Sequence, residues 1–205
     1  RNGFFGNRLA DIAQRYGAVT YTVDTPWGKP VDLDDLAKEL GKHPKVKAVA
    51  IVHGETSTGV LNPLRDVIDL AHSHDAVVMV DAVTSLGGHE VRMDDWGIDV
   101  CFSATQKCLG APPGLAPISL GPRAMDIINN RATQVESFYF SLQELESYWS
   151  QRRAYHHTAP ISMTYALREA LRMMMEEGLE NRLNRRARVA AALRAGLEAI
   201  GIGLL

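Results

Sequence analysis

Apolar residues along this chain recur at helical spacing in several segments. In residues 6–16 they occupy the i, i+3, i+4 and i+7 positions of one face, and Gly17 follows where such a helix is expected to end. The segment "DLDDLAKELGKH" predicts a second helix, with Asp32 as its N-cap and more acidic residues in its first turn. A third helix is predicted over "NPLRDVIDLAHSHD", where Pro63 stands near the first turn.

Shorter apolar runs between these segments predict strands. Residues 18–23 ("AVTYTV") predict a short strand, and residues 46–53, 76–81 and 99–105 are more continuously apolar. Uninterrupted apolar runs are typical of strands that are covered on both faces. Because such strands alternate with helices, the pattern predicts an α/β fold, a parallel sheet with helices on both sides.

The pattern changes after residue 120, where helices dominate. The segments "PRAMDIINNR" and "LQELESYWSQRR" are helical in pattern, and helices continue from about Ile161 to the end of the chain. The last segment, "LENRLNRRARVAAALRAGLEAI", combines a long apolar stripe with a strongly basic opposite side. We expect that basic side to be a solvated helix surface.

Composition narrows the classes of function. The chain has 205 residues, 46% of them hydrophobic and 22% charged, and a net charge of −2. These values are ordinary for a globular protein and give no support for nucleic-acid binding. No apolar stretch reaches the length of about 18 residues that a membrane-spanning helix needs. Two cysteines, Cys101 and Cys108, do not form a framework of the secreted kind, so we expect a soluble, intracellular protein.

Polar side chains follow three of the predicted strands, at the points where those strands end. Since the carboxyl ends of parallel strands meet at one edge, where ligands bind in open sheets, these side chains should converge on one site. They are His53, Glu55, Thr56, Ser57, Asp81, Thr84, Ser85, Gln106 and Lys107.

Asp81 ends an apolar strand, where a carboxylate needs a partner. The partner could be a metal ion, a basic side chain or a protonated ring nitrogen; alternatively, Asp81 could cap the segment that follows. A metal ion would need further ligands. His53 and His89 are available, but no recognisable ligand spacing supports them, so no metal site is predicted.

Lys107 lies between a buried strand and the turn "GAPPG", whose two prolines restrict the backbone. Such a lysine could pair with a phosphate, pair with a carboxylate or act as an amine nucleophile; alternatively, it is an ordinary surface lysine. Partial burial would disfavour its ammonium form, the condition for forming an imine with a carbonyl. Together, a buried acid and a constrained lysine suggest pyridoxal 5'-phosphate (PLP), the acid pairing with the ring nitrogen and the lysine holding the aldehyde.

The segments "HGETSTGVLNPL", "VDAVTSLGG", "SATQKCLGAPPG" and "YHHTAP" closely resemble the class V aminotransferases of PLP fold type I. Within that family the chain is most similar to the alanine–glyoxylate and serine–pyruvate aminotransferases. The resemblance implies a large, PLP-binding domain over residues 1–177 and the beginning of an α+β small domain over residues 178–205. It also implies transamination between alanine or serine and glyoxylate or pyruvate.

The resemblance assigns roles to individual residues. Lys107 matches the lysine that forms the Schiff base, and Asp81 matches the partner of the pyridinium nitrogen. Val83 matches a residue that packs on the ring, Thr56 a hydroxyl near the ring's phenolic oxygen, and Gln106 a phosphate contact.

Three further matches lie outside the strand ends. Phe5 matches the aromatic residue that stacks over the pyridine ring. Tyr155 and Thr158 match residues that reach the phosphate of the neighbouring subunit's cofactor, which implies an obligate homodimer. The chain opens at Arg1 without a methionine and closes where an apolar run has just begun, so we expect an internal piece of a longer protein. The resemblance implies that the family's phosphate loop lies before "NGFFG" and its substrate-binding arginine beyond Leu205.

Other functions remain open at this point. A 2-aminoethylphosphonate or pyridoxamine–pyruvate transaminase would carry similar motifs. A cysteine desulfurase would usually have histidine immediately before the lysine, where this chain has Gln106. The piece could also be inactive and serve only as a dimerising scaffold. The cellular compartment would be the cytoplasm in a bacterium and an unspecified organelle in a eukaryote.

Overall fold

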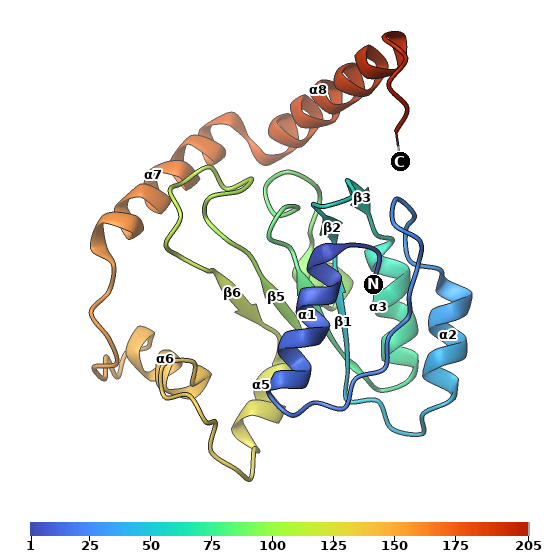
Figure 1. The fold of residues 1–205 in the computed structure, drawn as a ribbon. Coiled ribbons are helices and arrows are strands. Elements are labelled where there is room, and N and C mark those ends of the chain that lie inside the picture. The colour runs from blue at the N-terminus through green and yellow to red at the C-terminus, as the bar shows by residue number, and fades with distance from the viewer. Residues whose placement is uncertain (205) are drawn as a thin grey trace.

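The structure, a computed structural model that describes residues 1–204, is built around a four-stranded sheet of order β1-β4-β5-β6 (Figure 1). Strands β1, β4 and β5 are parallel, and β6 is antiparallel to β5. A separate two-stranded antiparallel hairpin follows β1 directly. The strands are β1 (Ala48–Val52), β2 (Gly54–Glu55), β3 (Val60–Leu61), β4 (Val77–Asp81), β5 (Val100–Phe102) and β6 (Ile118–Leu120).

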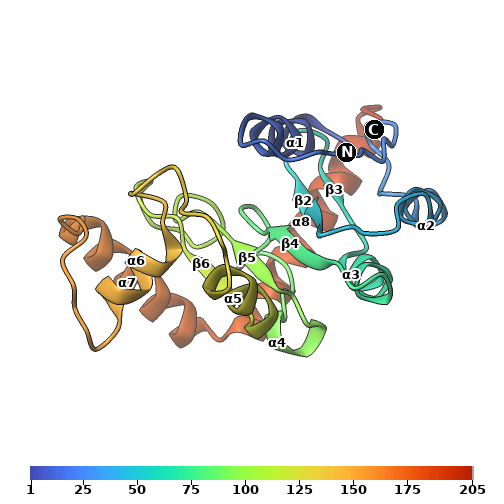
Figure 2. The ribbon, with the colours of Figure 1, turned by 90° about the horizontal axis from the view of Figure 1, so that it is seen from below.

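Helices surround the sheet, as the alternating pattern predicted. Helix α1 contacts β1 and β2, α3 packs on β4, and α2 packs on the outside of α3. Figure 2 shows α1 and α3 on opposite faces of the sheet. The helices are α1 (Phe4–Arg15), α2 (Leu33–Gly41), α3 (Leu64–Ser73), α4 (Met93–Trp96), α5 (Pro122–Asn129), α6 (Leu142–Trp149), α7 (Ile161–Glu177) and α8 (Leu179–Ala199).

The hydrophobic core lies between α3 and the central strand β4. Val67 and Ile68 of α3 and Val78 and Val80 of β4 are all 0% exposed. Burying a side chain of this size contributes about 1.5–3 kcal/mol. Strand β4 pairs with a strand on each side and packs against α3. Its last residue, Asp81, therefore has a fixed position at the edge of the sheet.

Several sequence-based predictions are confirmed. The first three helices form where the pattern indicates, and the Asp32 side chain caps α2 by accepting hydrogen bonds from the backbone N–H groups of Asp34 and Asp35 at 2.9 and 3.1 Å. The apolar runs before residues 53, 82 and 103 form the three parallel strands. These signals are local, which is why the sequence alone reveals them.

Two strand predictions are wrong. Residues 18–23 form no strand, because within residues 1–204 no neighbouring strand pairs with them, and Val19 and Tyr21 are 81% and 58% exposed. Strand β1 is not covered on both faces, since Ala48 and Ala50 are exposed in the described part of the chain. The sequence pattern also missed β6, the β2–β3 hairpin and the short helix α4.

The prediction for the last helix is also wrong in part. The Arg182 side chain is only 12% exposed and reaches the loops that follow β4 and β5, so the basic side of α8 is not uniformly solvated. The apolar stripe is itself exposed within the described residues, with Val189 at 62% and Leu193 at 63%.

Candidate active site

The carboxyl ends of β1, β4 and β5 meet at one edge of the sheet. In register, Val52 lies opposite Asp81, and Asp81 lies opposite Phe102. The segments beyond the strands remain in contact, because the Thr84 hydroxyl donates to the Gly54 carbonyl at 2.6 Å and the Cys108 thiol to the Thr84 carbonyl at 3.2 Å. The predicted convergence of the three strand ends is therefore confirmed.

Asp81 is partly buried at the centre of this edge. One carboxylate oxygen accepts the backbone N–H of Val83 at 2.9 Å, which is the local turn contact expected of an acid that caps the following segment. Within residues 1–204, no basic side chain forms an ion pair with it. Burial raises the pKa of Asp81, the nearby negative charge of Glu55 raises it further, and the Val83 N–H opposes both effects. Within residues 1–204, the other carboxylate oxygen of Asp81 accepts no hydrogen bond, so it can pair with a cationic group.

The turn that carries Lys107 is held by its own backbone. The Thr105 side chain is buried and donates to the Pro112 carbonyl at 2.7 Å, while the Ala111 N–H donates to the Thr105 carbonyl at 2.9 Å. The Gly110 N–H donates to the carbonyl of Lys107 itself at 3.1 Å. The prediction of a constrained turn is confirmed.

The side chain of Lys107 is exposed in the described part of the chain, as is Gln106. The expectation of a partly buried lysine is therefore wrong for residues 1–204, since the turn projects beyond the last strand residue, Phe102. Within those residues, the Lys107 amine forms no ion pair, so it is available to a ligand.

Glu55 has a role that the sequence reasoning missed. Its side chain is 0% exposed and accepts hydrogen bonds from the backbone N–H groups of Phe5, Gly6 and Ser57, at 3.4, 3.0 and 3.1 Å, and from the Ser57 hydroxyl at 2.6 Å. It thereby satisfies N–H groups at the start of α1, where a negative charge also interacts favourably with the helix dipole.

The pKa of Glu55 reflects the same contacts. Burial would raise the pKa, but the hydrogen bonds from Ser57, Gly6 and Phe5 together hold it below its ordinary value. Glu55 is thus a buried, ionised group that links the start of α1 to the loop after β1. Its place at a strand end was visible in the sequence, whereas its partners on α1 depend on the tertiary fold.

The other residues that the sequence assigned to the cofactor ring lie on α1 and on the segments that follow β2 and β4. Phe5, in the first turn of α1, is partly buried, and the Arg8 guanidinium lies 5.4 Å from the centre of its ring. Val83 is partly buried directly after the turn at Asp81, and Thr56 is exposed between β2 and β3.

Tyr155 and Thr158 lie apart from this group, in the segment between α6 and α7 (Figure 1). The Tyr155 hydroxyl is 3.2 Å from that of Thr158, and Tyr155 is 78% exposed. Among residues 1–204, no hydrogen bond joins either side chain to the strand ends. In Figure 1 the segment between α6 and α7 lies away from the loops that follow the carboxyl ends of β4 and β5.

No group of three or more His, Cys, Asp or Glu side chains in the described residues could hold a metal ion. None of the helices described is both long enough and apolar enough to cross a membrane.

Comparison with known proteins gives consistent matches over nearly the whole chain. The protein-family model for "Aminotransferase class-V" matches residues 6–204. The chain is 44% identical, over 220 residues, to the (S)-ureidoglycine–glyoxylate transaminase of Bacillus subtilis (strain 168), an alignment that covers 98% of this chain and 53% of the relative. It is 39% identical, over 206 residues, to the alanine–glyoxylate aminotransferase of Callithrix jacchus, covering 99% of this chain and 50% of the relative.

Solved structures give the same result. The alanine–glyoxylate aminotransferase from Nostoc sp. superposes with a TM-score of 0.94 at 43% identity, covering 98% of this chain and 53% of that one. The pyridoxamine–pyruvate aminotransferase from Mesorhizobium loti superposes with a TM-score of 0.91 at 31% identity, covering 98% and 51%. The chain spans about half the length of the relatives that it matches.

Proposed function

Since the chain belongs to the class V aminotransferase family, we propose that the protein containing it transfers an amino group from alanine or serine to glyoxylate or pyruvate. The chain also has the expected fold, a mostly parallel sheet flanked by helices as in the large domain of PLP fold type I enzymes. The observation that supports the proposal best is the acid at the end of β4, which has no cationic partner within residues 1–204 and lies opposite Phe102, the last residue of the strand that leads to the Lys107 turn.

The residues at this edge fit PLP. The free carboxylate oxygen of Asp81 suits a protonated pyridine nitrogen, which would lower the pKa that burial raises. The unpaired amine of Lys107 suits covalent attachment of the cofactor's aldehyde carbon. No metal ligand set competes for the site in the described residues.

When bound, PLP withdraws electrons from the α-carbon of an amino acid. The task of Asp81 is to keep the proton on the ring nitrogen, and a carboxylate fixed at the end of a buried strand needs no reorganisation to do so. Lys107, as a free amine, would accept the α-proton of the substrate at Nζ and would later donate that proton back to the substrate–cofactor pair.

The other assigned residues would orient the ring. Phe5 would stack on the ring and Val83 would pack against it, while Thr56 would hydrogen-bond near the phenolic oxygen and Gln106 near the phosphate. Glu55 supports this arrangement indirectly, because it holds the first turn of α1 against the loop that carries Thr56.

We also propose an obligate homodimer in which Tyr155 and Thr158 contact the phosphate in the neighbouring subunit's site. Two observations support this arrangement. Both side chains are exposed, and the segment that carries them lies away from the strand ends of its own chain (Figure 1). A neighbouring subunit would also cover Lys107 and so disfavour its ammonium form.

The boundaries of the large domain, 1–177, and of the start of a small domain, 178–205, remain predictions. Gly178, between α7 and α8, supports this boundary, and Leu205 lies outside the described residues. The intracellular location is also a proposal, which the two free cysteines support.

Glyoxylate is the better supported acceptor, because two of the relatives carry it in their names with different amino donors. Ureidoglycine is therefore a second candidate for the donor, and pyridoxamine with pyruvate is a third because of the match at a TM-score of 0.91.

The test uses the full-length protein, purified with PLP and supplied with each donor and acceptor in turn. Turnover of alanine or serine with glyoxylate or pyruvate supports the proposal. Exclusive turnover of ureidoglycine, pyridoxamine or 2-aminoethylphosphonate would correct the donor, and the absence of transamination with every pair would overturn the proposal.

A further inference from the structure

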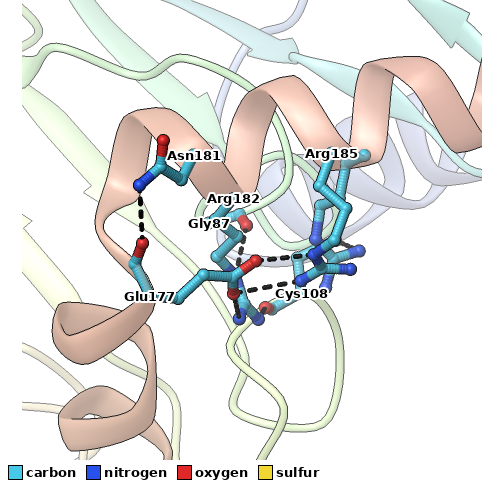
Figure 3. Close-up of polar contacts among 7 residues, drawn as sticks. Gly87, Cys108, Glu177, Asn181, Arg182 and Arg185 are labelled. Carbon is cyan, nitrogen blue, oxygen red and sulfur yellow. Dashed lines mark hydrogen bonds and ion pairs between the residues drawn. The ribbon is translucent and has the colours of Figure 1, made fainter.

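The first turns of α8 contact the loops of the active-site edge (Figure 3). The Arg182 guanidinium donates from Nε to the Gly87 carbonyl at 3.1 Å and from Nη2 to the Cys108 carbonyl at 2.8 Å. These two carbonyls belong to different loops, one after β4 and the other after β5. A single side chain from a distant part of the sequence therefore bridges both.

The orientation of Arg182 is itself fixed. Its Nη1 lies 3.1 Å from the Glu177 carboxylate, at the end of α7, and Arg185 binds the same carboxylate at 2.6 and 3.0 Å. The pKa of Glu177 lies below its ordinary value, and the hydrogen bonds from Arg185 are the largest cause. The acid therefore remains ionised opposite both arginines. Figure 3 shows Glu177 between the two side chains.

The bridged loops carry the proposed catalytic groups. The loop that links β4 to α4 directly follows Asp81 and contains Val83 and Gly87, and Cys108 directly follows Lys107. The loops are also pressed together, because a Cβ atom at Gly88 would lie 2.5 Å from the Cys108 sulfur. Since neither loop is part of a strand ladder here, their separation depends on such contacts.

We propose that Arg182 is a positioning residue that fixes the Asp81 loop and the Lys107 turn relative to each other. The inference rests on the proposed function, since it concerns the geometry of that same site. The planar guanidinium supplies donors in three directions at once, to two carbonyls and one carboxylate. A lysine ammonium has a single nitrogen on a flexible stem and cannot span the same three acceptors.

The experiment compares the full-length wild type with Arg182→Gln, Arg182→Lys and the control Arg185→Gln. Arg185 shares Glu177 with Arg182 but, among residues 1–204, forms no hydrogen bond to either loop, so the control removes an ion pair without removing the bridge. The first readout, on cofactor-free protein, is amide hydrogen exchange of residues 83–90 and 105–111. Both Arg182 variants should exchange faster than the wild type in both loops, and the control should match the wild type.

The second readout is on PLP-loaded protein. Both Arg182 variants should shift the pH at which the visible absorbance of the lysine-bound cofactor changes, and should lower kcat by about 10- to 100-fold with a smaller change in KM. The control should do neither. Arg182→Lys keeps the charge, so it remains informative if Arg182→Gln does not fold.

If a folded Arg182 variant shows the same amide hydrogen exchange as the wild type in both loops, the claim that Arg182 bridges them is refuted. Faster exchange with an unchanged absorbance titration and kcat would overturn the positioning role. A wild type that binds no PLP would overturn the proposed function, and the exchange comparison would separately confirm or refute the bridge.

Discussion

Replacement of Glu55 by glutamine is expected to weaken the attachment of α1 to the active-site edge. The carboxylate is 0% exposed, and its two oxygens accept four hydrogen bonds from Phe5, Gly6 and Ser57. A glutamine oxygen in the place of Oε1 can still accept three of them. The glutamine NH₂ group then takes the place of Oε2 and faces the Gly6 N–H, which is also a donor.

The magnitude follows from these contacts. A buried donor left without an acceptor costs about 1–3 kcal/mol, and the three remaining bonds lose their charge assistance. Loss of the negative charge at the start of α1 adds about 0.3–1 kcal/mol. We therefore expect Glu55→Gln to lower the free energy of unfolding by about 2–4 kcal/mol near neutral pH.

The assay is urea unfolding of the full-length protein, followed by fluorescence, with midpoint and slope compared between variants. Glu39→Gln is the matched control, because within residues 1–204 the Glu39 carboxylate, on the surface of α2, is hydrogen-bonded only to Lys42 and His43. Its midpoint should therefore change little. Equal midpoints for the two variants would refute the reasoning about Glu55.

The pH dependence provides an independent check. Because the folded pKa of Glu55 lies below its unfolded value of about 4.3, its contribution to stability is present above that pH and is lost as the pH falls through the folded pKa. The difference between wild type and Glu55→Gln should therefore shrink in acid. A constant difference there would contradict an ionised Glu55.

Three further changes have distinct expected outcomes. Lys107→Ala should abolish the visible absorbance of the lysine-bound cofactor in the PLP-loaded full-length protein; an unchanged spectrum would exclude Lys107 as the attachment point. Asp81→Asn should retain PLP but lower kcat by about 10²–10³-fold, the scale of removing one preorganised electrostatic group, and wild-type turnover would count against its role. Burial, and then the nearby His89, lower the pKa of His53 to about 4 from its ordinary 6.5. Between these pH values the unfolded state binds the proton and the folded state does not, so stability should fall by up to about 3 kcal/mol as the pH drops across this window. His53→Asn should flatten that slope in denaturant titrations at several pH values, and a persistent slope would assign it to other groups.

The parts of the fold that the sequence predicts are those encoded by local signals. The buried strand before Asp81, the cap at Asp32 and the proline-rich turn after Lys107 each depend on neighbouring residues, and all three are observed. The convergence of the strand ends followed from the geometry of parallel sheets, which requires no knowledge of side-chain contacts.

The parts that sequence reasoning missed depend on distant partners. Residues 18–23 have side chains suited to a strand, but a strand also needs a neighbouring strand to pair with. None is present for them within residues 1–204. Arg182 was expected on a solvated surface, because the pattern of α8 gives no sign of the carbonyls of Gly87 and Cys108. The role of Glu55 was missed for the same reason, since its partners Phe5 and Gly6 lie about fifty residues away in the sequence.

The central claim is that PLP is bound covalently at position 107 with its ring nitrogen beside Asp81. The most direct measurement is reduction of the PLP-loaded, full-length protein with borohydride, followed by mass-spectrometric mapping of the modified lysine. The account predicts a phosphopyridoxyl group on the peptide containing Lys107 and on no other lysine of the chain. A modification confined to another lysine, or none at all in protein shown to have bound PLP, would contradict it.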